Sequence, residues 1–264
     1  MSLHRFSRME LLVGQDGLKR LAASHVLVCG IGGVGSYAAE ALGRAGVGRI
    51  TLVDFDDVCL TNINRQIHAM SSTVGCSKVE VMAARVRDIN PDAEIVTVRE
   101  FFSHDNAERL LTPAPDYVLD AIDHFTAKAA LITACRERGI PVISSMGAAN
   151  KLDPTKIQVA DIADTRNCRM ARSMRKMLRQ RGVERGVQVV YSTEPHRELN
   201  PVASHCGLDC ICPNRGDQIF SCENRRVILG SISYIPSIFG LTMAGVVVNA
   251  LLGRAEASRT SNKF

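Results

Sequence analysis

The stretch that decides the fold runs from His25 to Gly35 and reads HVLVCGIGGVG. Its first five residues are mostly apolar, and a short apolar run that ends in glycines is typical of a buried parallel strand. A helix is expected to follow over 33–45. Glycines allow a tight turn and a close approach to phosphate, and the helix N-terminus offers unpaired N–H groups. The glycines of this turn are Gly30, Gly32, Gly33 and Gly35. The pattern predicts a nucleotide site. On its own it fits a NAD enzyme as well as an ATP enzyme, and a glycine-rich turn without a ligand is the alternative.

Outward from this turn, strands and helices alternate, which predicts a doubly wound, mostly parallel α/β sheet. The expected strands are 25–29, 49–54, 95–98, 117–121 and 141–145, with helices at 77–89, around 106 and at 127–138. After about residue 151 the pattern changes to strands at 157–160, 187–191 and 226–232, a basic segment, a cysteine-rich loop and an apolar helix. We therefore expect an adenylation-type nucleotide domain with an N-terminal helix over 1–155, and a C-terminal extension over 156–264 packed on the same domain.

The composition excludes several classes of protein. The 264 residues are 46% hydrophobic and 22% charged, which rules out disordered, collagen-like and coiled-coil chains. The polar N-terminus lacks the apolar core of a secretory signal, so a cytoplasmic location is expected. The apolar stretch Ile235–Leu252 is expected to be a buried or dimer-face helix, so no membrane is required; a membrane helix is the alternative.

Polar residues gather where the expected strands end, which is where open α/β sheets build their sites. Taken alone, Arg65 or Lys78 fits a solvated surface cation and Asp123 fits a helix N-cap. As a set, the candidates suit an enzyme that attacks the α-phosphate of ATP. Such an enzyme needs cations to neutralise the phosphates and a carboxylate to hold Mg²⁺. The candidates are Asp54, Asp56, Asn62, Arg65, Gln66, Lys78 and Asp123.

As a set, these residues and the glycine turn resemble the adenylation domain of the E1-like ThiF/MoeB superfamily, over about residues 6–150. Within it, TNINRQIHA at 61–69 and SSMGAANKLDPT at 144–155 are similar to the tRNA threonylcarbamoyladenosine dehydratase branch, a likeness that extends to about residue 252. The resemblance implies ATP-dependent adenylation of the carboxylate of N6-threonylcarbamoyladenosine in the tRNA anticodon loop, then cyclisation with release of AMP and pyrophosphate. Two alternatives stay open: activation of the C-terminus of a ubiquitin-like sulfur carrier, and a non-enzymatic nucleotide-bound module that binds RNA or a partner.

The resemblance also implies roles for single residues. Asp54 would face the ribose, Asp56 would complete the nucleotide site, and Asp123 would hold Mg²⁺. Arg8 would be inserted into the neighbouring subunit's site, which requires a homodimer; a solvated cation on an N-terminal helix is the alternative. The phosphates would be surrounded by the four glycines together with Asn62, Arg65, Gln66 and Lys78. The residues expected to take part in catalysis are Arg8, Arg65, Lys78 and Asp123.

The basic character of the chain is concentrated in one segment. Residues 166–185 contain eight basic residues and one acid, a net charge of +7 in a chain whose total is +5. Met170, Met174, Met177 and Leu178 form an apolar stripe at helical spacing, so the remaining face can present cations to RNA phosphates. The expected tRNA contacts are Arg172, Arg175, Lys176 and Arg179. A solvated helix or a dimer contact is the alternative.

Four of the nine cysteines lie close together, namely Cys206, Cys210, Cys212 and Cys222. Four thiolates can bind Zn²⁺ or an iron–sulfur cluster. Their spacing is not that of the paired Cys-x-x-Cys sites of sulfur-carrier activators. Unliganded thiols, and a sulfur-transfer or redox role with a cysteine desulfurase or sulfur-acceptor system as partner, are the alternatives.

Overall fold

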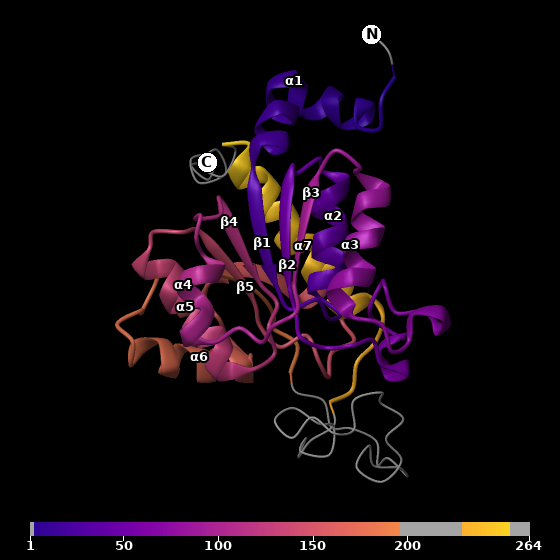
Figure 1. Cartoon of the computed structure of the whole chain (residues 1–264). Helices are drawn as coiled ribbons and strands as arrows, with labels where there is room; N and C mark the ends of the chain where they lie inside the picture. The colour runs from indigo at the N-terminus through magenta and orange to yellow at the C-terminus, as the bar shows by residue number, and fades with distance from the viewer. Residues whose placement is uncertain (1–2, 196–228, 254–264) are drawn as a thin grey trace.

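The computed structural model of the chain describes residues 3–195 and 229–253. Seven strands there form one sheet in the spatial order β3-β2-β1-β4-β5-β7-β6 (Figure 1). The strands are β1 (His25–Cys29), β2 (Arg49–Val53), β3 (Glu94–Val98), β4 (Tyr117–Asp120), β5 (Val142–Ser145), β6 (Ile157–Asp161) and β7 (Gln188–Ser192). All neighbours are parallel except β6 and β7, which are antiparallel. The predicted doubly wound, mostly parallel α/β fold is confirmed.

Helices cover both faces of the sheet (Figure 1). The helices are α1 (Ser7–Ala23), α2 (Gly35–Arg44), α3 (Lys78–Ile89), α4 (His104–Leu110), α5 (Phe125–Glu137), α6 (Arg169–Arg179) and α7 (Tyr234–Leu251). Short 3-10 turns lie at η1 (Leu60–Asn62), η2 (Ser71–Thr73), η3 (Pro154–Lys156) and η4 (Ile162–Asp164). α2, α3 and α7 pack together on one face, while α4, α5 and α6 pack on the other.

Strand β1 shows how the sequence divides the core between these two layers. Side chains alternate across a strand, so Val26 and Val28 join the cluster under α2, α3 and α7. Leu27 and Cys29 point the other way, into the cluster formed with α4 and α5. A strand buried on both faces has to be apolar at its buried positions, and the four residues after His25 show this pattern.

The C-terminal segment continues the same sheet. β7 pairs with β5, and β6 pairs with β7, so the expected boundary between residues 155 and 156 falls inside one continuous sheet. The strand expected at 226–232 is wrong where it can be seen, since 229–232 is irregular and 226–228 lie outside the described residues. The backbone of Gly230 bonds to Asn150 through both its N–H and its C=O, and Ser231 accepts from the amide of Asn64, so these groups are not available to a sheet.

α7 packs against α2 along one face, as predicted for a buried helix. A Cβ at Gly240 would lie 2.2 Å from the carbonyl oxygen of Val34, so glycine permits the two backbones to meet. Within the described residues, α7 is long and apolar enough to cross a membrane, with a mean hydropathy of 1.6, and 44% of it is buried inside the protein.

Candidate active site

The strand order reverses at β1, whose neighbours β2 and β4 lead to opposite halves of the sheet. In open α/β sheets, ligands bind in the crevice beyond the carboxyl ends of the strands at this point. The glycine turn follows β1, Asp54 and Asp56 follow β2, and Asp123 follows β4. The topology therefore brings three of the sequence-predicted groups to one edge.

The glycine turn is built by close backbone contacts at two positions. Gly30 has a φ of +88°, and a Cβ there would lie 2.7 Å from the carbonyl oxygen of Ala121. A Cβ at Gly35 would lie 1.7 Å from the carbonyl oxygen of Gly30. At Gly32, by contrast, the nearest atom is the amide nitrogen of Gln66, at 3.9 Å. Gly30 and Gly35 are thus required by the fold, while Gly32 leaves free space in front of the turn.

Asp54 locks the glycine turn to the end of β2. Its Oδ2 accepts the N–H of Ile31 at 2.6 Å, and its Oδ1 accepts the N–H of Asp56 at 2.9 Å. Burial raises the pKa of Asp54, and the positive charge of Lys78 partly offsets this. A carboxylate whose two oxygens both hold backbone N–H groups has a structural task in addition to any contact with a ribose.

Lys78 provides a buried positive charge beside this turn. Its Nζ lies 2.6 Å from Oδ2 of Asp56, and its side chain is 7% exposed. Burial lowers the pKa of Lys78, but the charges of Asp54 and Asp56 raise it, and the net shift is upward. The ammonium group therefore stays charged at neutral pH, which a phosphate-binding role would require.

Asp123 lies in the turn after β4 and is exposed. Its negative charge also raises the pKa of Lys78, so the two groups face the same region. Among residues 3–195 and 229–253, no group of three or more His, Cys, Asp or Glu side chains is arranged to hold a metal ion. A cation at Asp123 would therefore need further ligands from a bound nucleotide.

The segment 62–66 lies beside the glycine turn. Oδ1 of Asn62 accepts the N–H of Cys59 at 3.0 Å and so shapes η1. Arg65 donates from Nη1 to the carbonyl oxygen of Thr61 at 2.8 Å, and its backbone touches the Gly33 position. Gln66 is buried, and its Oε1 finds no hydrogen-bond partner in the described part of the chain. A buried acceptor without a partner needs an explanation, and a bound ligand or water provides one.

A buried cluster behind the turn was missed by sequence reasoning. Lys128 Nζ lies 2.8 Å from Oδ2 of Asp120 and 3.2 Å from Oγ of Ser144, and both charged side chains are 0% exposed. The one signal in the sequence is a lysine on an otherwise apolar face of α5. A lone lysine on a helix is usually solvated, so this signal is weak.

Arg8 belongs to α1, and this helix lies at the opposite end of the sheet from the carboxyl ends of the parallel strands (Figure 1). Around it, Phe6 packs near Gly46 in the loop before β2, and Arg5 donates to the carbonyl oxygen of Ile89 before β3. Arg8 itself is exposed. The structure therefore does not bring Arg8 to the site of its own chain.

The basic helix α6 packs as its apolar stripe predicts, with Met174 and Leu178 buried. Its N-terminus lies near the active-site edge, because Met170 packs beside Gly147, just after β5. Arg172, Lys176 and Arg179 are exposed. Arg175 differs, since its Nη1 donates to the carbonyl oxygens of Ile162 at 3.2 Å and Thr165 at 3.0 Å.

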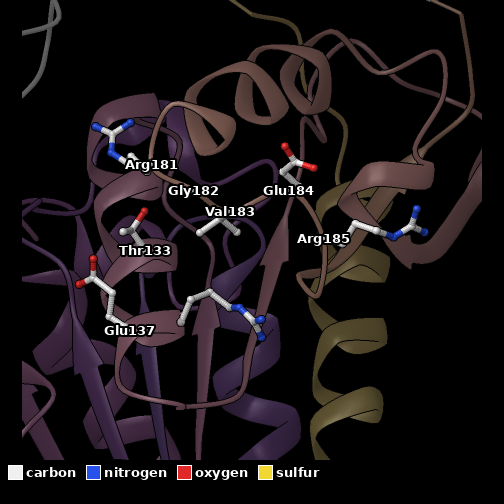
Figure 2. Close-up of a pocket in the computed structure, with 8 residues that line it drawn as sticks. Thr133, Glu137, Arg181, Gly182, Val183, Glu184 and Arg185 are labelled. Carbon is white, nitrogen blue, oxygen red and sulfur yellow. The ribbon is translucent and has the colours of Figure 1, made fainter.

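Beyond α6, the turn 181–185 and α5 enclose a hollow of about 400 Å³ (Figure 2). Arginine and glutamate side chains both line it, among them Arg181, Glu184 and Glu137. The turn precedes β7, which is parallel to β5, so this hollow lies away from the carboxyl ends of the parallel strands. It is not part of the candidate active site. The four clustered cysteines, Cys206, Cys210, Cys212 and Cys222, lie outside the described residues, so their role stays a prediction.

The ThiF family model matches residues 6–264, and the chain therefore belongs to the ThiF family. A tRNA threonylcarbamoyladenosine dehydratase of Bacillus subtilis is 44% identical over 261 residues, which is 99% of this chain and 100% of the relative. Crystal structures of the Escherichia coli tRNA N6-threonylcarbamoyladenosine dehydratase, TcdA, are also similar. The complex with AMP has a TM-score of 0.82 at 37% identity, covering 97% of this chain and 96% of the other. The complex with ATP has a TM-score of 0.76 at 36% identity, covering 98% and 96%. Within the ThiF family, the chain groups with the tRNA threonylcarbamoyladenosine dehydratases.

Proposed function

We propose that this chain is an ATP-dependent tRNA threonylcarbamoyladenosine dehydratase that acts in the cytoplasm. The observation that carries the proposal is the Lys78–Asp56 pair beside the glycine turn, in a chain that matches a dehydratase along its whole length. Solved relatives bind ATP and AMP, which fits a nucleotide in front of Gly32, where the turn leaves space. Activation of a sulfur carrier is less supported, because the full-length relatives described above are dehydratases.

In the first step, the carboxylate of the threonylcarbamoyl group attacks the α-phosphorus of ATP and expels pyrophosphate. Lys78 and Arg65 stabilise the negative charge that develops on the phosphates. Asn62 and Gln66 bind beside them, and the unpaired Oε1 of Gln66 is free to accept a hydrogen bond from the substrate or a water. The product is an acyl-adenylate.

In the second step, the carbamoyl oxygen of the same group attacks the activated carbonyl carbon, AMP leaves, and a proton is lost from the carbamoyl nitrogen. The new ring has five members. Because the reacting groups belong to one molecule, high effective molarity replaces an enzyme nucleophile. One carboxylate oxygen of the substrate leaves as part of AMP. The substrate therefore loses the elements of water, and the cleavage of ATP to AMP and pyrophosphate consumes them.

Mg²⁺ fits the chemistry of the site, since it usually binds one or two carboxylates together with substrate phosphates. Asp123 would hold it, because Asp56 is already paired with Lys78. The ion would neutralise charge on the nucleotide phosphates.

The exposed cations of α6 support a tRNA partner. Arg172, Lys176 and Arg179 form a row that starts at the active-site edge and leads away from it. Such a row can follow a phosphate backbone. Arg175 is held by the η4 region and contributes to the fold of this segment instead.

A homodimer would bring Arg8 to an active site. Leu11 and Leu12 on the same helix are 81% and 76% exposed, which suits a helix that packs on another chain. A groove of about 520 Å³, lined by residues such as Met9, Tyr37 and Leu241, lies between α1, α2 and α7. We infer that a second copy of the chain covers these apolar surfaces.

The test follows modified tRNA nucleosides by mass spectrometry in a reaction with ATP. Lys78→Ala and Asp123→Ala should each lower the rate of cyclisation by about 100-fold or more, the usual effect of removing a group that stabilises transition-state charge. Lys19→Ala, an exposed lysine on α1, is the matched control. Undiminished cyclisation in both site variants would overturn the assignment, and formation of ADP instead of AMP would overturn the mechanism.

A further inference from the structure

Asp120 and Lys128 form an ion pair that no step above uses. Both side chains are fully buried, and Ser144 donates from Oγ to the same Asp120 oxygen at 2.6 Å. Lys128 lies in the second turn of α5, among buried neighbours such as Ala127, Ala129 and Leu131.

Stability alone does not explain this pair. The desolvation of two buried charges can exceed their attraction, and apolar residues of similar volume often stabilise a core as well or better. A buried ionic group in an otherwise apolar layer therefore points to another task, which the remaining contacts of Asp120 identify.

The second oxygen of Asp120 bonds to the turn that carries Asp123. Oδ1 accepts the N–H of Ile122 at 3.1 Å, and so holds the turn 121–123 from behind. In this turn, the carbonyl group of Ala121 packs on Gly30. The polar side chain of the same turn is that of Asp123. One carboxylate thus links the core to the glycine turn and to the expected Mg²⁺ ligand.

We propose that Asp120, held in place by Lys128 and Ser144, is a positioning residue that sets where Asp123 lies relative to the glycine turn. Lys128 and Ser144 both bond to Oδ2 of Asp120, which leaves Oδ1 to hold the turn. This inference rests on the proposed role of Asp123 as the carboxylate that binds Mg²⁺.

The test measures ATP affinity by titration calorimetry with and without Mg²⁺. The main variant is the uncharged pair Asp120→Ala with Lys128→Met, which leaves no unpaired buried charge and should stay folded. We expect the Mg²⁺-dependent gain in ATP affinity to fall about tenfold, the usual loss when a group that orients a metal ligand is removed. ATP affinity without Mg²⁺ should stay nearly unchanged.

A second pair, Asp120→Asn with Lys128→Met, restores an acceptor for the N–H of Ile122 and should regain most of the Mg²⁺ effect. If Asp120 had only a structural role, the two double variants would show the same Mg²⁺-dependent gain in ATP affinity when their thermal stabilities are equal. Arg138→Met removes an ion pair with Glu108 at the end of the same helix and should leave both affinities unchanged.

A full Mg²⁺ effect in the Ala/Met pair would overturn this inference and leave the proposed function intact. A wild-type protein that binds ATP equally well with and without Mg²⁺ would overturn the role of Asp123 as well. A wild-type protein that binds no ATP would overturn the proposed function itself.

Discussion

At the scale of the single residue, His68 shows how burial sets charge beside the site. Its side chain is 1% exposed, and neither ring nitrogen finds a hydrogen-bond partner in the described part of the chain. Burial, together with the positive charges of Lys78 and Arg85, lowers the pKa of His68 to about 3. The imidazole is therefore neutral at physiological pH.

This neutrality predicts a pH dependence of folding. The folded pKa lies below the ordinary value of 6.5, so below pH 6.5 the unfolded chain binds a proton that the folded chain does not. The stability that the folded protein gains from keeping His68 neutral is fully present above pH 6.5 and is lost progressively as the pH falls toward 3. At pH 5 the loss is about 2 kcal/mol. Urea unfolding at pH 7.5 and pH 5 should show this loss in the wild type and much less of it in His68→Leu.

His104, which is exposed on α4, provides the control for this experiment. His104→Leu should keep the wild-type difference between the two pH values. An equal difference in His68→Leu and in the wild type would show that other groups cause the acid sensitivity.

At the scale of the element, the glycine turn separates folding from ligand binding. Gly35→Ala forces a Cβ against the carbonyl oxygen of Gly30, and such overpacking should cost about 3 kcal/mol of stability. Gly32→Ala meets no protein atom closer than 3.9 Å, so the fold should tolerate it. If a phosphate lies in front of Gly32, this same variant should lose about tenfold in ATP affinity, because the backbone can no longer approach closely.

Thermal unfolding and ATP titration of the two glycine variants check this pair of expectations. Gly32→Ala with wild-type stability and wild-type ATP affinity would show that the nucleotide does not occupy the space in front of the turn.

Helix α6 leads to a second prediction at this scale. Replacing Arg172, Lys176 and Arg179 with Glu should weaken tRNA binding and lower the slope of log affinity against log salt by about 2–3, since each phosphate contact contributes about 0.9. ATP binding should be unaffected. Filter binding at several salt concentrations measures the slope, with Lys19→Glu on α1 as the control. Unchanged tRNA affinity in the triple variant would show that RNA binds elsewhere.

Arg175→Glu should behave differently from its neighbours. It removes the bonds to Ile162 and Thr165 and places a carboxylate beside their carbonyl oxygens, so it should lower the unfolding temperature. The sequence could not separate Arg175 from Arg172 and Arg179, because all three lie on one basic helix. Only the position of η4 in the fold decides which of them is taken up by the chain's own backbone.

The difference between local patterns and contacts made only in the folded chain also decides which other features could be predicted from the sequence. β1 and the glycine turn depend on local patterns of apolar residues and glycines, and the structure has them where the sequence places them. Lys128 could not be identified, because its burial depends on Asp120 and Ser144, which meet it only when β4 and β5 pair. Residues 229–232 resemble a strand in composition, but their hydrogen bonds go to loops distant in sequence.

At the scale of the whole molecule, the position of Arg8 predicts an active site shared between subunits. Helix α1, which carries Arg8, lies at one end of the sheet (Figure 1), whereas Lys78 lies beside Asp56, after the carboxyl end of β2. A site that needs both residues must therefore draw them from two chains. Arg8→Ala and Lys78→Ala homodimers should each be nearly inactive. When the two variants are mixed and allowed to exchange subunits, each mixed dimer has one site with both residues intact. Random exchange should therefore restore about a quarter of the wild-type activity, as expected for a two-fold symmetric dimer.

A mixture of Lys78→Ala and Asp123→Ala is the control for sites made within one chain. A mixed dimer of these two variants would contain one intact site only if Lys78 and Asp123 came from different chains. Because Lys78 and Asp123 face the same region of one chain, this second mixture should stay inactive. An Arg8→Ala homodimer with wild-type activity would show that each chain works alone, and an inactive first mixture would show that Arg8 does not act across the dimer.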